Sequence, residues 1–131
     1  MSLTWSAASF VVGGVLCGAA LVLTGCASPL PSSGPVAVYP RPDSGMDAAL
    51  EGVLRADDDC VAVSTHDSAV VPQFPAGDAS WRDGVLTWRG GEYRDGDAIS
   101  LGGGMGGEDG LDRGYWPDGC RGLVSFTVSP Y

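Results

Sequence analysis

The sequence predicts a small all-β domain, a closed or partly closed antiparallel barrel of six short strands. Three observations predict this class: apolar and polar residues alternate over short runs, turn residues separate these runs at near-regular spacing, and no convincing long helix interrupts them. The chain has 131 residues, including 21 Gly and 9 Pro. This length allows one domain at most.

The first three predicted strands cover residues 53–56, 60–65 and 69–74. The acidic run at 57–59 separates the first two and suits a hairpin turn. The third strand ends at the sequence Pro-Ala-Gly-Asp that begins at Pro75. Turn chemistry therefore delimits each of these strands.

Residues 44–55 allow two interpretations. Their apolar residues fall at helical spacing, and Ser44 with Asp47 resembles a capping box. Gly52 would destabilise such a helix by about 1 kcal/mol. We favour a short helical or irregular lead-in that ends near Leu50, followed by a strand.

The last three predicted strands cover residues 85–88, 98–101 and 123–128. An Asp-Gly turn at 83–84 precedes the first of them, and the last alternates cleanly between apolar and hydroxyl side chains. The glycine-rich run 102–110 partly resembles a calcium-binding nonapeptide repeat. It is a single imperfect copy, so we interpret it as a flexible loop.

The first 40 residues carry no charged side chain, because all 7 Arg and all 16 Asp and Glu lie between Arg41 and Arg121. Within this uncharged part, residues 10–23 form an unbroken apolar run. The run is shorter than the roughly 18 residues that span a bilayer, but it suits the apolar region of a secretory signal peptide.

The sequence Leu-Thr-Gly-Cys at 23–26 begins at the last residue of this apolar run. It resembles the lipobox of bacterial lipoproteins. The resemblance implies cleavage after residue 25, a diacylglyceryl group on the sulfur of Cys26, and a fatty acid such as palmitate on the new amino terminus. Residues 1–25 would then be the signal peptide, although residues 1–9 lack the usual Lys or Arg. The alternative is an ordinary cysteine at the end of an uncleaved, short anchor.

Residues 26–45 are rich in Pro, Ser and Gly, and we interpret them as a disordered tether beyond the lipidated cysteine. An alternative is that Val36, Val38 and Tyr39, which alternate, pack onto the domain as an edge strand. The folded domain is then predicted to cover residues 46–131.

Two cysteines remain for the domain after Cys17 leaves with the signal peptide and Cys26 takes the lipid. These are Cys60 and Cys120, and an exported protein meets an oxidising compartment. We therefore predict a disulfide between them, which would stabilise the fold by about 4 kcal/mol on the chain-entropy model. Two buried free thiols or a metal-binding pair are the alternatives.

Composition excludes several function classes. The chain contains no Lys and a single His, His66, which removes P-loop, Schiff-base and paired-histidine zinc chemistry. The net charge of -9 argues against a nucleic-acid partner. We predict no cofactor and no metal site. We also name no catalytic residues, because His66 and its polar neighbours are adjacent in a turn, whereas a catalytic triad is built from separated segments.

The order of core and turn residues from 50 to 128 resembles small exported domains of high-GC Gram-positive bacteria. The resemblance rests on 51–61, 72–75, Trp81, 83–84 and 93–104. It implies an OB-like barrel and no catalytic residues.

Aromatic residues are the remaining candidates for a binding site. Exposed rings on OB barrels stack with bases or sugars, so Trp81, Trp88, Tyr93 and Trp116 are a possible ligand face. The alternative is that these rings fill the core.

Together these features predict a lipid-anchored protein on the extracytoplasmic side of the cell membrane. Its β domain would be a non-enzymatic binding or structural module, and its partner an envelope glycan or protein. A small envelope hydrolase or a calcium-dependent module is the alternative.

Overall fold

The computed structural model describes residue 14 and residues 28–111 and 113–130. The predicted signal peptide, apart from Gly14, and the predicted lipidation site Cys26 therefore lie outside the described residues. Within the described part, no helix is long and apolar enough to cross a membrane.

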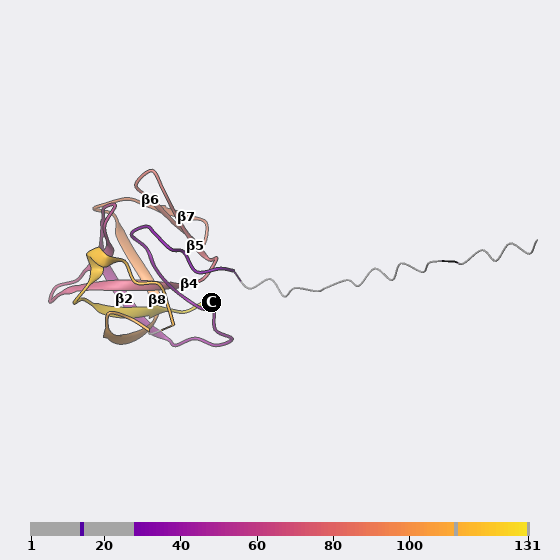
Figure 1. The fold of residues 1–131 in the computed structure, drawn as a ribbon. Helices are drawn as coiled ribbons and strands as arrows, with labels where there is room; N and C mark the ends of the chain where they lie inside the picture. The colour runs from indigo at the N-terminus through magenta and orange to yellow at the C-terminus, as the bar shows by residue number, and fades with distance from the viewer. Residues whose placement is uncertain (1–13, 15–27, 112, 131) are drawn as a thin grey trace, which may run out of the picture.

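The described residues form nine β-strands and one short 3₁₀ helix, and no α-helix (Figure 1). The elements in chain order are β1 (Ala37–Tyr39), β2 (Ala48–Ala56), β3 (Val61–Ser64), β4 (Ala69–Pro75), β5 (Ala79–Arg82), β6 (Val85–Trp88), β7 (Gly91–Tyr93), β8 (Ala98–Glu108), η1 (Asp118–Cys120) and β9 (Val124–Val128).

Five of these strands close into a barrel in the order β2-β3-β4-β9-β8 and back to β2. The contact between β4 and β9 is parallel, and the other neighbours are antiparallel. Counted along the chain, the barrel strands follow the order 1-2-3-5-4, which is the arrangement of an OB-type Greek-key barrel. The predicted all-β OB-like fold is confirmed, but its barrel has five strands and not six, because the strand predicted at 85–88 is β6 of a separate sheet. Its largest fully buried side chains include Phe74, Phe126, Leu54, Leu86 and Leu101.

A three-stranded sheet, β5-β6-β7, is inserted between the third and fourth barrel strands. Its two hairpin turns are Asp83–Gly84 and Arg89–Gly90, and all four residues have positive φ. This conformation is the type I′ turn, whose twist matches that of the flanking strands. Leu86 and Trp88 of β6 are buried in the same cluster as the barrel core, so the small sheet closes one side of the barrel.

The predicted tether is wrong over residues 36–39, where the alternative of an added strand is observed. β1 pairs in parallel with β4, with Val38 opposite Phe74. Val36 and Val38 belong to the main core, whereas Ala37 belongs to a second buried cluster outside the barrel. Both faces of this short strand are therefore buried.

The helical interpretation of residues 44–55 is also wrong, because β2 already begins at Ala48 and pairs with β8 from that residue onward. Gly52 lies against the backbone of Ser64 and the side chain of Val63. A side chain at position 52 would collide with the neighbouring strand, so glycine here permits close strand packing.

The predicted flexible loop at 102–110 is in fact mostly strand, because β8 continues to Glu108 and pairs with β9. Its glycines are sites of close approach. A Cβ atom on Gly103 would meet the carbonyl oxygen of Thr127, and one on Gly106 would meet the hydroxyl of Ser125. The glycines therefore allow tight packing between strands.

Replacing Gly103 with Ala should lower the free energy of unfolding by about 1–3 kcal/mol, because the added methyl group must displace backbone. The neighbouring change Gly102→Ala is the matched control, since nothing lies within 4 Å of a Cβ atom there. It should leave stability unchanged or slightly raised. Urea denaturation of both variants measures the difference. Equal effects at the two positions would show that β8 does not pack as described.

The predicted disulfide is confirmed, since Cys60 and Cys120 are bonded with their α-carbons 5.2 Å apart. The bond joins the turn between β2 and β3 to η1, which precedes β9. It therefore connects two loops at the same end of the barrel.

Candidate functional site

The four aromatic residues predicted as a ligand face do not form one surface. Trp88 is 6% exposed and its ring lies 5.0 Å from that of Phe74, so it is a core residue and its assignment to a ligand face is wrong. In the small sheet, Trp81 on β5 and Tyr93 on β7 are the cross-strand neighbours of Leu86 on β6. Both rings are half-buried against the same core.

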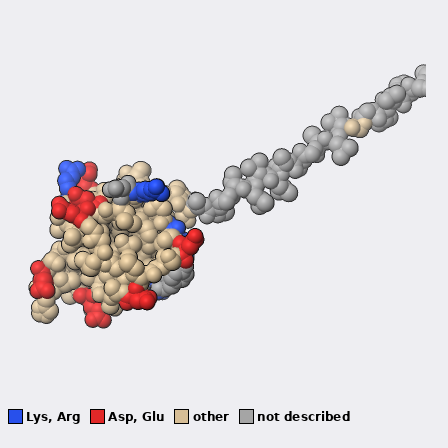
Figure 2. All heavy atoms as spheres, turned by 90° about the horizontal axis from the view of Figure 1, so that it is seen from below, with Lys and Arg blue, Asp and Glu red and all other residues tan. Residues whose placement is uncertain are grey.

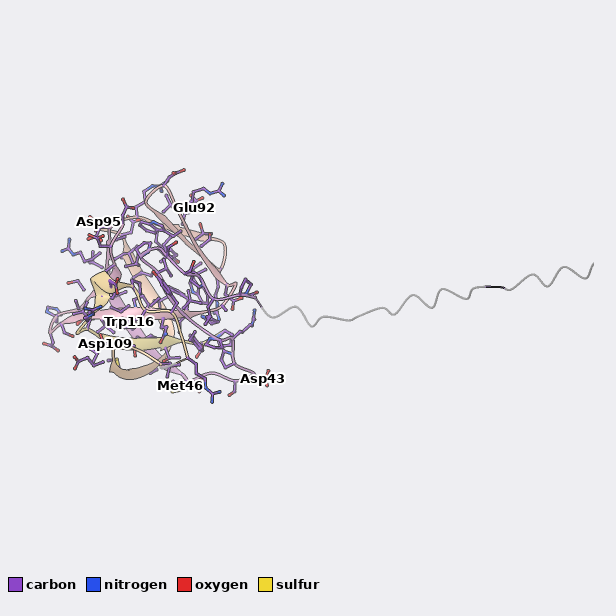
Figure 3. All side chains as sticks on the ribbon, in the orientation of Figure 1. Asp43, Met46, Glu92, Asp95, Asp109 and Trp116 are labelled. Carbon is purple, nitrogen blue, oxygen red and sulfur yellow. A yellow bond between two sulfur atoms is a disulfide. The ribbon has the colours of Figure 1, made fainter. Side chains whose placement is uncertain are left out.

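Trp116 belongs to a different cluster from the other three rings. It packs over the outer face of β3 and β4, and Figure 3 shows it apart from Glu92 of the small sheet. Its indole nitrogen is buried, with no hydrogen-bond partner among the described residues. The structure therefore separates Trp116 from the other predicted ligand residues.

OB barrels commonly bind ligands on the outer face of their second and third strands and on the adjoining loops. Here those strands are β3 and β4, from which Ala62 and Val71 point away from the barrel interior. Both are nonetheless buried, at 6% and 0% exposed. They are covered by other parts of the same chain, namely Ala37, Trp116, Cys120 and Leu123.

Hydrogen bonds hold this cover in place. The side chain of Gln73 on β4 is fully buried, donates to the carbonyl oxygen of Val38 at 3.1 Å and accepts from the backbone N–H of Leu111 at 3.1 Å. Val38 and Tyr115 exchange two further backbone hydrogen bonds. The protein's own residues therefore cover the usual OB ligand face, and these hydrogen bonds and the disulfide hold them there.

A mostly apolar groove of about 560 Å³ lies elsewhere, between the segment that follows β1 and the end of β9. Met46 and Leu111 are 51% and 43% exposed in it. Among the described residues that line it, Arg113 is the only Arg, and none is Asp, Glu, His or Cys. The groove is lined by Tyr39, Pro40, Pro42, Ser44, Gly45, Met46, Leu111, Arg113, Thr127 and Ser129.

Two hydroxyl groups shape this groove. The backbone N–H of Met46 donates to Oγ of Ser129 at 2.8 Å, and that hydroxyl donates to the carbonyl oxygen of Met46 at 2.7 Å. The phenol of Tyr39 donates to the carbonyl oxygen of Val128 at 2.5 Å. Burial, followed by the negative charge of Asp78, raises the pKa of Tyr39 above 10.0. Tyr39 is therefore a neutral hydrogen-bond donor near pH 7.

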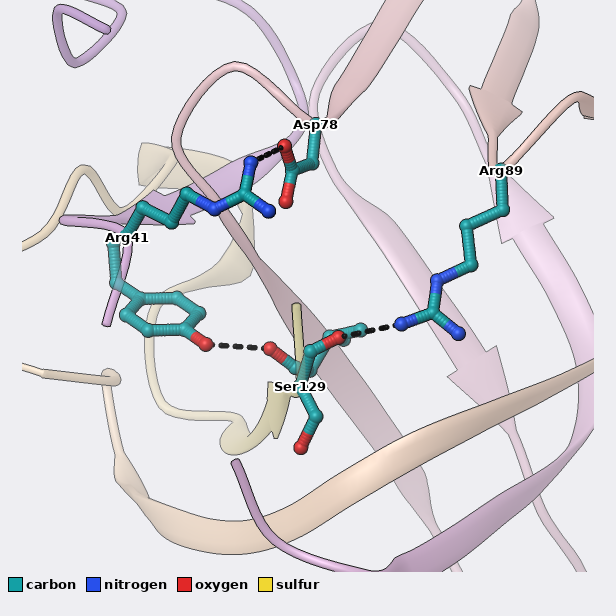
Figure 4. Close-up of polar contacts among 6 residues, drawn as sticks. Arg41, Asp78, Arg89 and Ser129 are labelled. Carbon is teal, nitrogen blue, oxygen red and sulfur yellow. Dashed lines mark hydrogen bonds and ion pairs between the residues drawn. The ribbon is translucent and has the colours of Figure 1, made fainter. Parts of the chain in front are cut away.

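A charged corner adjoins the groove (Figure 4). Arg41 forms an ion pair with Asp78 at 2.6 Å, and Arg89 donates to the carbonyl oxygen of Ser129 at 3.3 Å. The guanidinium of Arg89 also lies 5.1 Å from the centre of the Trp88 ring. A second hollow lies here and is lined by Arg41, Asp78, Trp88, Arg89 and Pro130.

The other polar features of the sequence have local structural roles. Oδ1 of Asp57 accepts backbone hydrogen bonds from Asp59 and Cys60, which closes the turn between β2 and β3. Asp109 accepts from the backbone N–H of Gly122 at 2.6 Å, and His66 is exposed in a turn. Within residues 28–111 and 113–130, no three His, Cys, Asp or Glu side chains gather as metal ligands could.

The sequence predictions missed the groove, because its Pro-rich wall lies in the segment interpreted as a tether. The available signal was Met46, a large apolar residue a few positions after Pro40 and Pro42.

Comparisons of this chain with protein-family models, with curated proteins and with solved structures found no match.

Proposed function

We propose that this protein is a lipid-anchored module on the extracytoplasmic side of the cell membrane. The observation that carries the proposal is the sequence Leu-Thr-Gly-Cys at 23–26, placed at the end of an apolar run that is too short to span a bilayer. The disulfide between Cys60 and Cys120 supports export, because such bonds persist in oxidising compartments.

We further propose that the domain binds a partner and does not catalyse a reaction. The groove supports this, since its described lining is mainly apolar and contains no carboxylate, imidazole or thiol that could transfer a proton or attack a substrate. Apolar clefts with a few polar groups are the usual form of a binding site. Arg113 would give the groove a preference for an anionic group on the partner.

The anchor can be tested by replacing Cys26 with Ser in the full-length protein in its native host. The variant should move from the membrane fraction to the soluble or secreted fraction, because no thiol remains to carry the lipid. The matched control is Cys17→Ser, which removes a thiol from the predicted signal peptide and should leave the protein in the membrane fraction. Membrane retention of both variants would contradict lipidation of Cys26.

A further inference from the structure

We propose that the groove faces the membrane and that the lipid surface, including its anionic headgroups, occupies it. This inference rests on the proposed anchor at Cys26 and adds an orientation and a partner to it. It is carried by the distance from the anchor to the domain, by the position of the groove, and by the charge and exposed apolar side chains near it.

The chain contacts the domain almost immediately after the proposed anchor. The side chain of Ser28 packs against Gly77, in the turn after β4. Ser28 is the second residue after Cys26, and two residues span at most about 7 Å. A lipid on Cys26 would therefore hold this side of the domain at the membrane surface and leave no long spacer between them.

The groove lies on the same side of the domain as Ser28. Gly77 is followed by Asp78, whose carboxylate binds Arg41, and Arg41 stands between two prolines that line the groove. In Figure 1, the described chain enters the domain on the side where its C-terminus also lies, whereas η1 lies at the opposite end. The anchor would thus bring the groove, and not η1, to the lipid.

Three Arg side chains lie on this side of an acidic protein. Among the described residues, the groove and the adjoining hollow are lined by Arg41, Arg89 and Arg113 and by the carboxylate of Asp78. The whole chain has 7 Arg against 16 Asp and Glu, and Figure 2 shows acidic side chains at several places on one face of the domain. Asp43 belongs to the same segment but is not one of the residues that line the groove. Arginines in this position suit the phosphates of anionic lipids.

Exposed apolar side chains are also concentrated here. Of the four large apolar side chains exposed in the described part of the chain, Met46 and Leu111 line the groove and Leu30 is two residues from Ser28. Only Met105 lies elsewhere, on β8. Apolar side chains flanked by cations are the combination that inserts into the headgroup region of a bilayer.

A spin label can test this orientation in the protein purified from its native membranes and reconstituted in vesicles of phosphatidylglycerol and phosphatidylethanolamine. One label is placed at the groove through Ser44→Cys, and another in the exposed turn between β3 and β4 through His66→Cys. Protein without an added cysteine gives the background. We expect the label at 44 to become several-fold less accessible to a water-soluble nickel chelate and more accessible to oxygen, with no change at 66. Equal accessibility of the two labels to the nickel chelate would overturn the proposed membrane-facing groove.

Substitutions in the groove separate a real contact from mere proximity. The double change Met46→Ser and Leu111→Ser should abolish the protection at position 44, whereas Met105→Ser, which changes an exposed methionine outside the groove, should preserve it. Protection that survives the double change would contradict insertion of these side chains.

The mass of the N-terminal peptide from the same sample shows whether Cys26 carries a lipid, so it distinguishes this inference from the proposed anchor. A lipid on Cys26 with position 44 in water would overturn the membrane-facing groove and leave the anchor intact. Lipid contact at position 44 with an unmodified Cys26 would support the surface and contradict the anchor. Absence of both would overturn both proposals.

Discussion

Replacing Cys60 and Cys120 together with Ala should lower the free energy of unfolding by about 4 kcal/mol, since the disulfide closes a loop across a sequence separation of 60 residues. A loss of this size is a large part of the stability of so small a domain. Urea denaturation under oxidising conditions measures it. The reduced wild-type protein is the matched control and should unfold near the same urea concentration as the variant. Oxidised and reduced wild-type protein of equal stability would contradict a stabilising role for the bond.

The same substitution should loosen the cover over β3 and β4. Cys120 is fully buried beside Val71, and the bond anchors the segment that carries Trp116. Backbone amides in the segment between β8 and β9 should therefore exchange with solvent faster in the variant, by a larger factor than amides of β2. Uniform acceleration across the domain would show that the bond acts on global stability alone.

Replacing Trp88 with Ala should lower the free energy of unfolding by about 3–5 kcal/mol, because it removes a buried ring and leaves a cavity beside Phe74. The matched control is Trp81→Ala on the neighbouring strand, which truncates a half-buried ring and should cost distinctly less. Denaturant titration of both variants measures the difference. A smaller loss for Trp88 than for Trp81 would contradict the core position of Trp88.

Most of the barrel could be predicted from the sequence because turn residues delimit its strands. β8 alternates between exposed and buried residues over 98–103, whereas β4, which is buried on both faces, shows only as a short, mostly apolar run between turns. All six predicted strands are present within β2, β3, β4, β6, β8 and β9. The short strands β1 and β7 have three residues each, and β1 is buried on both faces, so neither shows alternation over a useful length. Periodicity identifies a strand only where its two faces differ.

Glycine was the least informative residue type in the sequence. The run in β8 was interpreted as flexible, yet Gly103 and Gly106 are required for close contact with β9. The Asp83–Gly84 turn was predicted correctly, because the Asp-Gly pair has a specific backbone requirement. A glycine chosen for a turn and one chosen for close packing look alike until the neighbouring strand is known.

The candidate site depended on tertiary structure that sequence patterns do not carry. Whether Trp88 faces the core or solvent depends on how β6 packs on the barrel, and the cover over β3 and β4 depends on β1 and a long loop meeting at Gln73. The groove combines residues from 39 to 129. Only the proposed lipidation site is local enough to be proposed from a short stretch of sequence, Leu-Thr-Gly-Cys at 23–26.

The mass of the N-terminal peptide of the protein purified from its native membranes tests the central claim most directly. The proposed anchor predicts that the mature chain begins at Cys26 and that this residue carries a diacylglyceryl group on its sulfur. A peptide in which an unmodified Cys26 is still preceded by Gly25 would contradict the claim.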